Sequence, residues 1–124
     1  MSISTKKILI IDDDSRNIFA LTAVLKAKGY NCLSAVSAQQ GLDILNTDQE
    51  IGVVLMDMMM PDMDGYQAIA KMKENEELKE VPVIAVTAQA MVGDRERCLN
   101  AGADGYVSKP VNVDELMLLL KNHI

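Results

Sequence analysis

Short apolar runs recur along the chain and are separated by longer stretches of mixed composition. The runs cover residues 8–11, 32–36, 51–56, 81–86 and 103–107, of which the second and the last are the least continuous. Runs of this length without strict alternation are typical of strands that are buried on both faces of a sheet. We therefore predict five strands, each covered by other elements on both sides.

Between these runs, apolar residues recur at three- and four-residue steps, the spacing of an amphipathic helix. One such stretch follows each run, and a glycine stands where the first and the fourth helix should stop. The defining residues are Ile18, Leu21 and Leu25 before Gly29; Leu42 and Leu45; Ala68, Ile69 and Met72 after Asp64; residues 95–100 before Gly102; and Val113, Leu116, Met117 and Leu120. Strand–helix alternation implies right-handed crossovers and a parallel sheet. We predict an α/β fold, a doubly wound five-stranded parallel sheet.

Length and composition fit one compact domain. The chain has 124 residues, of which 49% are hydrophobic, and it contains no low-complexity stretch, so we expect a single domain over residues 1–124. The net charge of -6 argues against nucleic-acid binding, which needs a basic face. No apolar stretch is long enough to cross a membrane, and Cys32 and Cys98 lack the spacing of metal ligands. We expect a cytoplasmic protein that binds neither nucleic acid nor membrane.

Polar residues with chemical potential follow four of the predicted strands. They are Asp12 and Asp13 after the first run, Asp57 after the third, Thr87 after the fourth and Lys109 after the fifth. In an open parallel sheet, ligands bind beyond the carboxyl ends of the strands, so these side chains should meet at one edge. Each of them alone could be a loop residue or a helix cap. Together they favour a functional site.

The acids at this edge need a compensating cation, because neighbouring carboxylates repel each other. With only oxygen ligands nearby, the cation should be Mg²⁺, with Mn²⁺ as a substitute. A carboxylate can also act as a nucleophile and form an aspartyl phosphate. The metal and Lys109 would offset the charge of the phosphoryl group, and Thr87 would donate a hydrogen bond to it.

The same residues, in this order, resemble the receiver domain of two-component response regulators, including chemotaxis regulators. The matching motifs are Asp12-Asp13, Asp57 followed by Pro61 and Asp64-Gly65, Thr87-Ala88, and Lys109-Pro110. The resemblance covers essentially the whole chain. It implies a flavodoxin-like (βα)5 fold with strand order 2-1-3-4-5.

The resemblance also implies a role for each residue of the site. Asp57 would accept a phosphoryl group from a phosphohistidine on a histidine kinase or a histidine phosphotransfer protein. Asp13, Asp57 and the backbone carbonyl of Met59 would bind Mg²⁺, and Asp12 would assist through water. Lys109 would contact the phosphoryl oxygens. The chain would then be a signalling phosphoacceptor, not an enzyme beyond its own phosphorylation and dephosphorylation.

By the same resemblance, Thr87 and Tyr106 form a switch pair in which the hydroxyl moves to the phosphate and the ring follows inward. The expected output surface consists of the fourth helix, the fifth strand and the fifth helix, where a downstream target or a second copy of the chain would bind. Leu118 lies opposite the predicted core face of the last helix and is a candidate for this surface. Met59 and Gln89 would flank the path of the hydrolytic water.

Three other functions explain the acids less well. A calcium loop at Asp62-Met63-Asp64-Gly65 would need ligands at Met60 and Lys71. A phosphatase of the haloacid dehalogenase type would need an acid at Met59, and a flavodoxin-like electron carrier would need a phosphate loop where three aspartates stand. The sequence leaves open whether the domain acts alone or belongs to a hybrid histidine kinase.

Overall fold

The computed structural model describes residues 6–88 and 93–123. Within these residues, strands and helices alternate along the chain, as the apolar pattern predicts. The strands are β1 (Lys7–Ile11), β2 (Asn31–Ala35), β3 (Ile51–Asp57), β4 (Val83–Thr87) and β5 (Gly105–Ser108). The helices are α1 (Ser15–Ala27), α2 (Ala38–Thr47), α3 (Gly65–Lys73), α4 (Asp94–Asn100) and α5 (Val113–His123).

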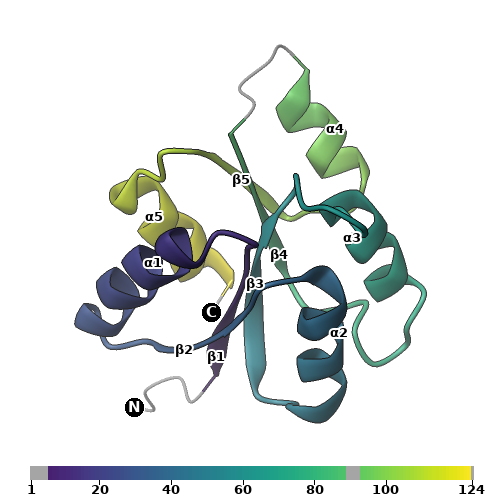
Figure 1. Cartoon of the computed structure of the whole chain (residues 1–124), viewed down its shortest axis with the longest axis horizontal. Helices are drawn as coiled ribbons and strands as arrows, with labels where there is room; N and C mark the ends of the chain where they lie inside the picture. Colours follow the sequence, from purple (N-terminus) through teal and green to yellow (C-terminus); the bar gives the residue numbers. More distant parts are fainter. Residues whose placement is uncertain (1–5, 89–92, 124) are drawn as a thin grey trace.

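The strands form one parallel sheet in the order β2-β1-β3-β4-β5, which confirms the predicted doubly wound fold. Helices α1 and α5 cover one face of the sheet, and α2, α3 and α4 cover the other (Figure 1). The order reverses between β1 and β3, so the carboxyl ends of these two strands flank the point where α/β sheets bind ligands.

The core has two layers because successive residues of a strand point to opposite faces. In β1, Ile8 and Ile10 pack toward α1 and α5, whereas Leu9 and Ile11 pack toward α2, α3 and α4. All four side chains are buried. This two-sided burial explains why the strand is an unbroken apolar run.

Two predicted strands begin later than expected. We predicted a strand over 81–86, but β4 starts at Val83, because Val81 closes a turn on the carbonyl of Leu78 and Pro82 has no N–H to donate. We predicted another over 103–107, but the Ala103 N–H still bonds to a carbonyl of α4, and β5 starts at Gly105. In both cases the first two residues of the predicted strand belong to the end of the preceding turn or helix.

Helix α5 is less fully buried than its pattern predicts. Leu116 and Leu120 are buried, and Met117 is partly buried against the same core cluster, whereas Val113 is only partly covered, so the prediction that all four form the core was wrong for Val113. Leu119 also packs against this cluster, at the start of β5 beside Gly105. The core stripe of this helix is therefore narrower and slightly rotated. No helix in residues 6–88 and 93–123 is long and apolar enough to span a membrane.

Helix α3 is fixed directly against the end of β3. Asp64 is its N-cap, and a capping box joins the side chains of Asp64 and Gln67 to each other's backbone N–H. A side chain at Gly65 would place its Cβ 2.7 Å from the Cα of Met58, so only glycine permits this approach. The Asp-Gly pair thus holds α3 close to the residues that follow Asp57.

Candidate functional site

Three carboxylates meet at the carboxyl edge of the sheet. Asp12 follows β1 and Asp57 ends β3, and these strands are neighbours with Ile11 opposite Met56. Oxygen atoms of Asp12, Asp13 and Asp57 all lie within 4.8 Å of one another. Asp12 and Asp57 are buried, whereas Asp13 is exposed to solvent. We call these three residues the acidic cluster.

Lys109 approaches the acidic cluster from the end of β5. Its ammonium Nζ lies 3.2 Å from Asp12 Oδ2 and 3.7 Å from Asp57 Oδ2. The Lys109 backbone is anchored by a 2.8 Å hydrogen bond from its N–H to the Thr87 carbonyl, and the Lys109-Pro110 peptide bond is cis. The sheet thereby brings together an acid pair, a third acid and a lysine that are far apart in the sequence.

The two oxygens of Asp57 have different surroundings. Oδ1 accepts a 3.0 Å hydrogen bond from the Met59 backbone N–H, whereas Oδ2 faces the Lys109 ammonium. Met58 continues the backbone pairing by donating its N–H to the Val86 carbonyl at 3.0 Å. The carboxylate is therefore held by backbone contacts on one side and open to a charged partner on the other.

Burial is the main reason that the pKa of Asp57 is raised, from an ordinary 3.8 to about 6. The Met59 N–H and the Lys109 ammonium oppose the shift, while the charge of Asp12 and a hydrogen bond with Asp13 add to it. One lysine does not fully offset three carboxylates. The oxygen-only donors and their close spacing fit a hard divalent cation such as Mg²⁺.

Asn17 belongs to this site, although the sequence pattern did not identify it. Its side-chain amide donates to Asp12 Oδ2 at 2.5 Å, and the Asp14 N–H donates to Asp12 Oδ1 at 2.8 Å. With Lys109, these donors fix the orientation of the Asp12 carboxylate. Asn17 lies in the first turn of α1, where a polar residue usually faces solvent. The only signal in the sequence was that Asn17 follows Asp12 closely along the chain.

The predicted switch residues lie on adjacent strands. Thr87 is buried at the end of β4, one residue beyond Val86, which pairs with Asp57. Tyr106 lies on β5 and is half-buried, and its hydroxyl donates a 3.0 Å hydrogen bond to Asp94 of α4. The tyrosine hydroxyl thus contacts α4.

The methionines after Asp57 divide as predicted. Met58 and Met60 are buried in the core, whereas Met59 is 52% exposed. Ligation of a metal by the Met59 carbonyl stays a prediction. Gln89, the other predicted neighbour of the hydrolytic water, lies outside the described residues.

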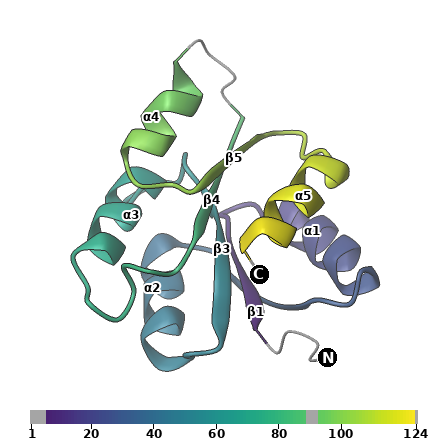
Figure 2. The same cartoon turned by 180° about the vertical axis from the view of Figure 1, so that it is seen from behind.

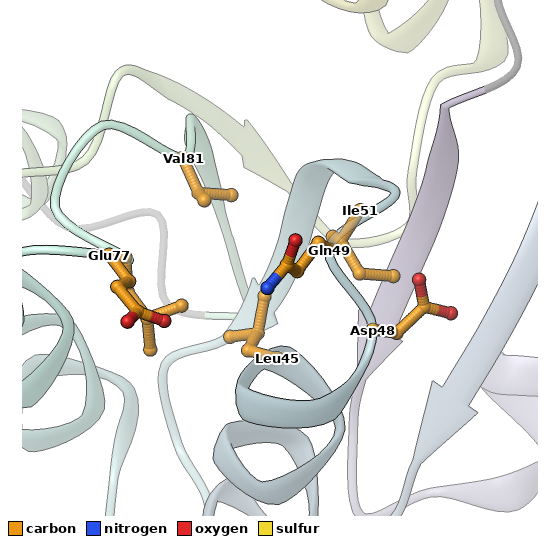
Figure 3. Close-up of a pocket in the computed structure, with 7 residues that line it drawn as sticks. Leu45, Asp48, Gln49, Ile51, Glu77 and Val81 are labelled. Carbon is orange, nitrogen blue, oxygen red and sulfur yellow. The ribbon is translucent and has the colours of Figure 1, made fainter.

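One pocket lies away from the acidic cluster. A cavity of about 320 Å³ lies at the opposite edge of the sheet, between the end of α2, the start of β3 and the segment before β4 (Figure 3). Its lining includes Leu45, Ile51 and Val81, with Glu77 beside them. None of the acidic cluster residues lines this pocket.

The family model for the response regulator receiver domain matches residues 8–121. This chain belongs to that family. Receiver domains are the phosphoacceptors of two-component signalling, interact with histidine kinases and downstream targets, and are not enzymes in the usual sense. The predicted family and fold are therefore confirmed.

Individual relatives agree with this assignment. The receiver domain is 33% identical over 120 residues to the polar-differentiation response regulator DivK of Brucella ovis, with 97% of each chain covered. It is also similar to the receiver domain of a sensor histidine kinase from Pseudomonas aeruginosa (TM-score 0.86, 33% identity, 95% of this chain and 96% of the other), whose structure has a magnesium ion in the active-site cleft. A receiver domain from Clostridium thermocellum matches with a TM-score of 0.87 and 30% identity over 96% of this chain and 94% of that one.

Proposed function

We propose that Asp57 accepts a phosphoryl group from the phosphohistidine of a histidine kinase or a histidine phosphotransfer protein. The observation that carries this proposal is the setting of Asp57: a buried carboxylate at the end of β3, in the acidic cluster and within 3.7 Å of the Lys109 ammonium. A lone structural acid would not need two further acids and a lysine around it.

The nucleophile is Asp57 Oδ2, because Oδ1 is engaged by the Met59 N–H. An electron pair of Oδ2 forms the new bond to phosphorus while the P–N bond to the donor imidazole breaks, and its electron pair passes to the imidazole nitrogen, which takes up a proton. Lys109, whose ammonium lies 3.7 Å from this oxygen, contacts the phosphoryl oxygens and offsets their charge.

Asp13, Asp57 and the Met59 carbonyl would hold Mg²⁺, with Asp12 assisting through water, and Mn²⁺ would substitute for it. The bound ion supplies positive charge that lets an anionic phosphoryl group approach a carboxylate. Asp12 is oriented for this task by Asn17 and the Asp14 N–H. Asp12 also lies 3.2 Å from the Lys109 ammonium, so it contacts both the other acids and the lysine.

The Thr87 hydroxyl donates to the attached phosphoryl group, and Tyr106 follows it inward. The signal leaves through the α4–β5–α5 face to a downstream protein or to a second copy of the chain, in the cytoplasm and without nucleic acid or membrane. The net charge of -6 supports a protein partner over nucleic acid. The domain also catalyses loss of its own phosphoryl group.

Incubation with acetyl phosphate and Mg²⁺, followed by intact mass measurement, tests this function. We expect one added phosphate, which is lost with Asp57→Asn and in EDTA. Asp62→Asn is the matched control, because Asp62 is an exposed turn residue nearby whose positive φ of 68° asparagine also adopts. Equal phosphate on the Asp57→Asn variant would exclude Asp57 as the acceptor.

A further inference from the structure

A buried carboxylate outside the acidic cluster, Asp94, lies at the start of α4. Its exposed fraction is 5%, and Asp94 is the first residue of this seven-residue helix. The Tyr106 hydroxyl donates to Asp94 Oδ2 at 3.0 Å from the neighbouring strand β5. An ionised side chain is rarely buried unless a donor compensates for the water it has lost. The tyrosine hydroxyl is such a donor.

Helix α4 is held by side chains from both of its neighbours. On the α3 side, the Tyr66 hydroxyl lies 3.6 Å from the Cys98 sulfur, and the Arg97 guanidinium lies 5.0 Å from the centre of the Tyr66 ring. On the β5 side, the Tyr106 hydroxyl bonds to Asp94. Figure 2 shows α4 beside α3 on one face of the sheet, with its first turn toward the carboxyl edge. A change at Asp94 would therefore alter how α4 is attached to β5.

The charge of Asp94 acts on the groups around it. Burial raises the pKa of Tyr106, and the hydrogen bond and charge of Asp94 raise it further. Burial also raises the pKa of Cys98 and raises the pKa of Tyr66 to about 12. The charge of Asp94 adds to both shifts. Asp94 is thus the centre of a small polar cluster between α3, α4 and β5.

We propose that Asp94 is a positioning residue for the switch: it holds the Tyr106 ring against α4 in the unphosphorylated domain and opposes its movement toward Thr87. This inference rests on the proposed function, because it assumes that phosphorylation draws the tyrosine inward. When the ring moves, a buried carboxylate loses a donor, which costs free energy. The Tyr106–Asp94 bond therefore favours the unphosphorylated arrangement, and the phosphoryl group must offset it.

The consequence for signalling lies at the first turn of α4. Because Asp94 begins the helix, loss of its bond to β5 frees this end of α4 while Tyr66 still holds Cys98 in the second turn. The surface between α4 and β5 would then change without any movement of the sheet. Through this bond, the position of the Tyr106 ring determines the position of the first turn of α4.

The contact is tested first without phosphorylation, by NMR of protein labelled with ¹³C at the tyrosine Cζ. The Tyr106 signal is identified by its absence in Tyr106→Phe. We expect Asp94→Ala to shift this signal and to lower the pKa of Tyr106, and Asp94→Asn to do so partially, because an amide oxygen still accepts. Glu96→Ala is the matched control, since it removes an exposed acid from the same turn of α4. A Tyr106 signal and pKa that are the same in Asp94→Ala and Glu96→Ala would overturn the proposal.

The role in switching is tested with beryllofluoride and Mg²⁺, a stable substitute for the phosphoryl group. Because Asp94→Ala removes a bond made only before switching, we expect it to tighten beryllofluoride binding by about tenfold. Adding Tyr106→Phe to Asp94→Ala should tighten it no further, since both changes remove the same bond. An unchanged affinity in both Asp94→Ala and Asp94→Asn, which keeps an accepting oxygen and the side-chain volume, would overturn the switching role. No binding by the wild type would contradict the proposed function itself, while the NMR result would still decide whether Asp94 positions Tyr106.

Discussion

At the scale of single residues, Asp57 is the group whose surroundings matter most. In the folded domain, its pKa is raised to about 6 from 3.8, mainly by burial. Between these values the folded protein binds more protons than the unfolded chain. The contribution of Asp57 to the free energy of unfolding is therefore fully present below about pH 3.8 and is lost as the pH rises through about 6.

Asp57→Asn should accordingly stabilise the metal-free domain at neutral pH. We expect its free energy of unfolding to exceed that of the wild type by about 1–2 kcal/mol near pH 7.5, because solvent close to the sheet edge reduces the full effect of the shift. The difference should shrink toward zero near pH 4. Urea unfolding in EDTA at several pH values measures it, and a difference that does not vary with pH would contradict the raised pKa.

Asp13 and Lys109 should affect Mg²⁺ binding in opposite directions. Asp13→Asn removes a ligand charge and should weaken Mg²⁺ binding about tenfold. Lys109→Ala removes a cation that lies 3.2 Å from Asp12, so Mg²⁺ should bind equally well or more tightly. Titration of both variants with Mg²⁺ measures the two affinities. Equal weakening in both would mean that the lysine assists the metal and does not compete with it.

The residues of the acidic cluster were predictable because each ends an apolar run, and parallel strands end at one edge. Asn17 and Asp94 were not, because both lie in the first turn of a helix, where polar residues are common at solvent-facing positions. Their partners, Asp12 and Tyr106, become visible only when the helix is placed against the sheet. Contacts of this kind depend on how each helix is rotated about its own axis. The periodicity of apolar residues predicts which broad face is buried, but not which single side chain meets a given partner.

At the scale of elements, the segment between β3 and α3 should set the lifetime of the phosphoryl group. Met59 follows Asp57 closely and its side chain is 52% exposed, but it has no group that can position a water. We expect Met59→Asn to change the decay rate of the phosphorylated domain severalfold. The decay is followed by intact mass after removal of the phosphodonor. Leu118→Ser on α5 is the control for a distant surface change, and an equal effect of both variants would exclude Met59 from the water path.

Element boundaries show where sequence patterns lose accuracy. Within residues 6–88 and 93–123, the existence and order of the strands and helices followed from the alternation of apolar runs and helical spacing. The starts of β4 and β5 did not, because an apolar residue such as Val81 or Ala103 can belong to a turn and still pack against the core. Hydrogen bonding, not hydrophobicity, decides these ends. The cap at Asp64 was predictable because its side chain bonds to its own helix.

At the scale of the whole molecule, the signal should leave through the α4–β5–α5 face. Leu118 is 64% exposed on α5, which is unusual for a large apolar residue and consistent with a binding surface. If phosphorylation promotes association through this face, Leu118→Ser should weaken the association of the phosphorylated domain with its partner or with itself by about tenfold.

Phe19→Ser is the matched control for this prediction, because Phe19 is 77% exposed on α1, outside the proposed face. Sedimentation velocity with and without beryllofluoride compares self-association of the wild type and both variants, and a pull-down compares partner binding. If Phe19→Ser abolishes association and Leu118→Ser does not, the output surface lies on α1.

The sheet and its two covering layers were predictable from local patterns, and the strand order followed from the family resemblance. The direction of the Tyr106 side chain was not, because it depends on the packing of α4 against β5. The family resemblance predicts which residues form the switch, and the structure adds the contact between Tyr106 and Asp94.

The most direct test of the whole account is to locate the phosphoryl group by chemical trapping. Borohydride reduces an aspartyl phosphate to homoserine with loss of phosphate, so a digest of the trapped protein identifies the residue by mass. After treatment with acetyl phosphate and Mg²⁺, we predict homoserine at position 57 and at none of the other aspartates. Homoserine at Asp12 or Asp13, or none at all when Mg²⁺ is present, would contradict the assignment of Asp57 as the phosphoacceptor.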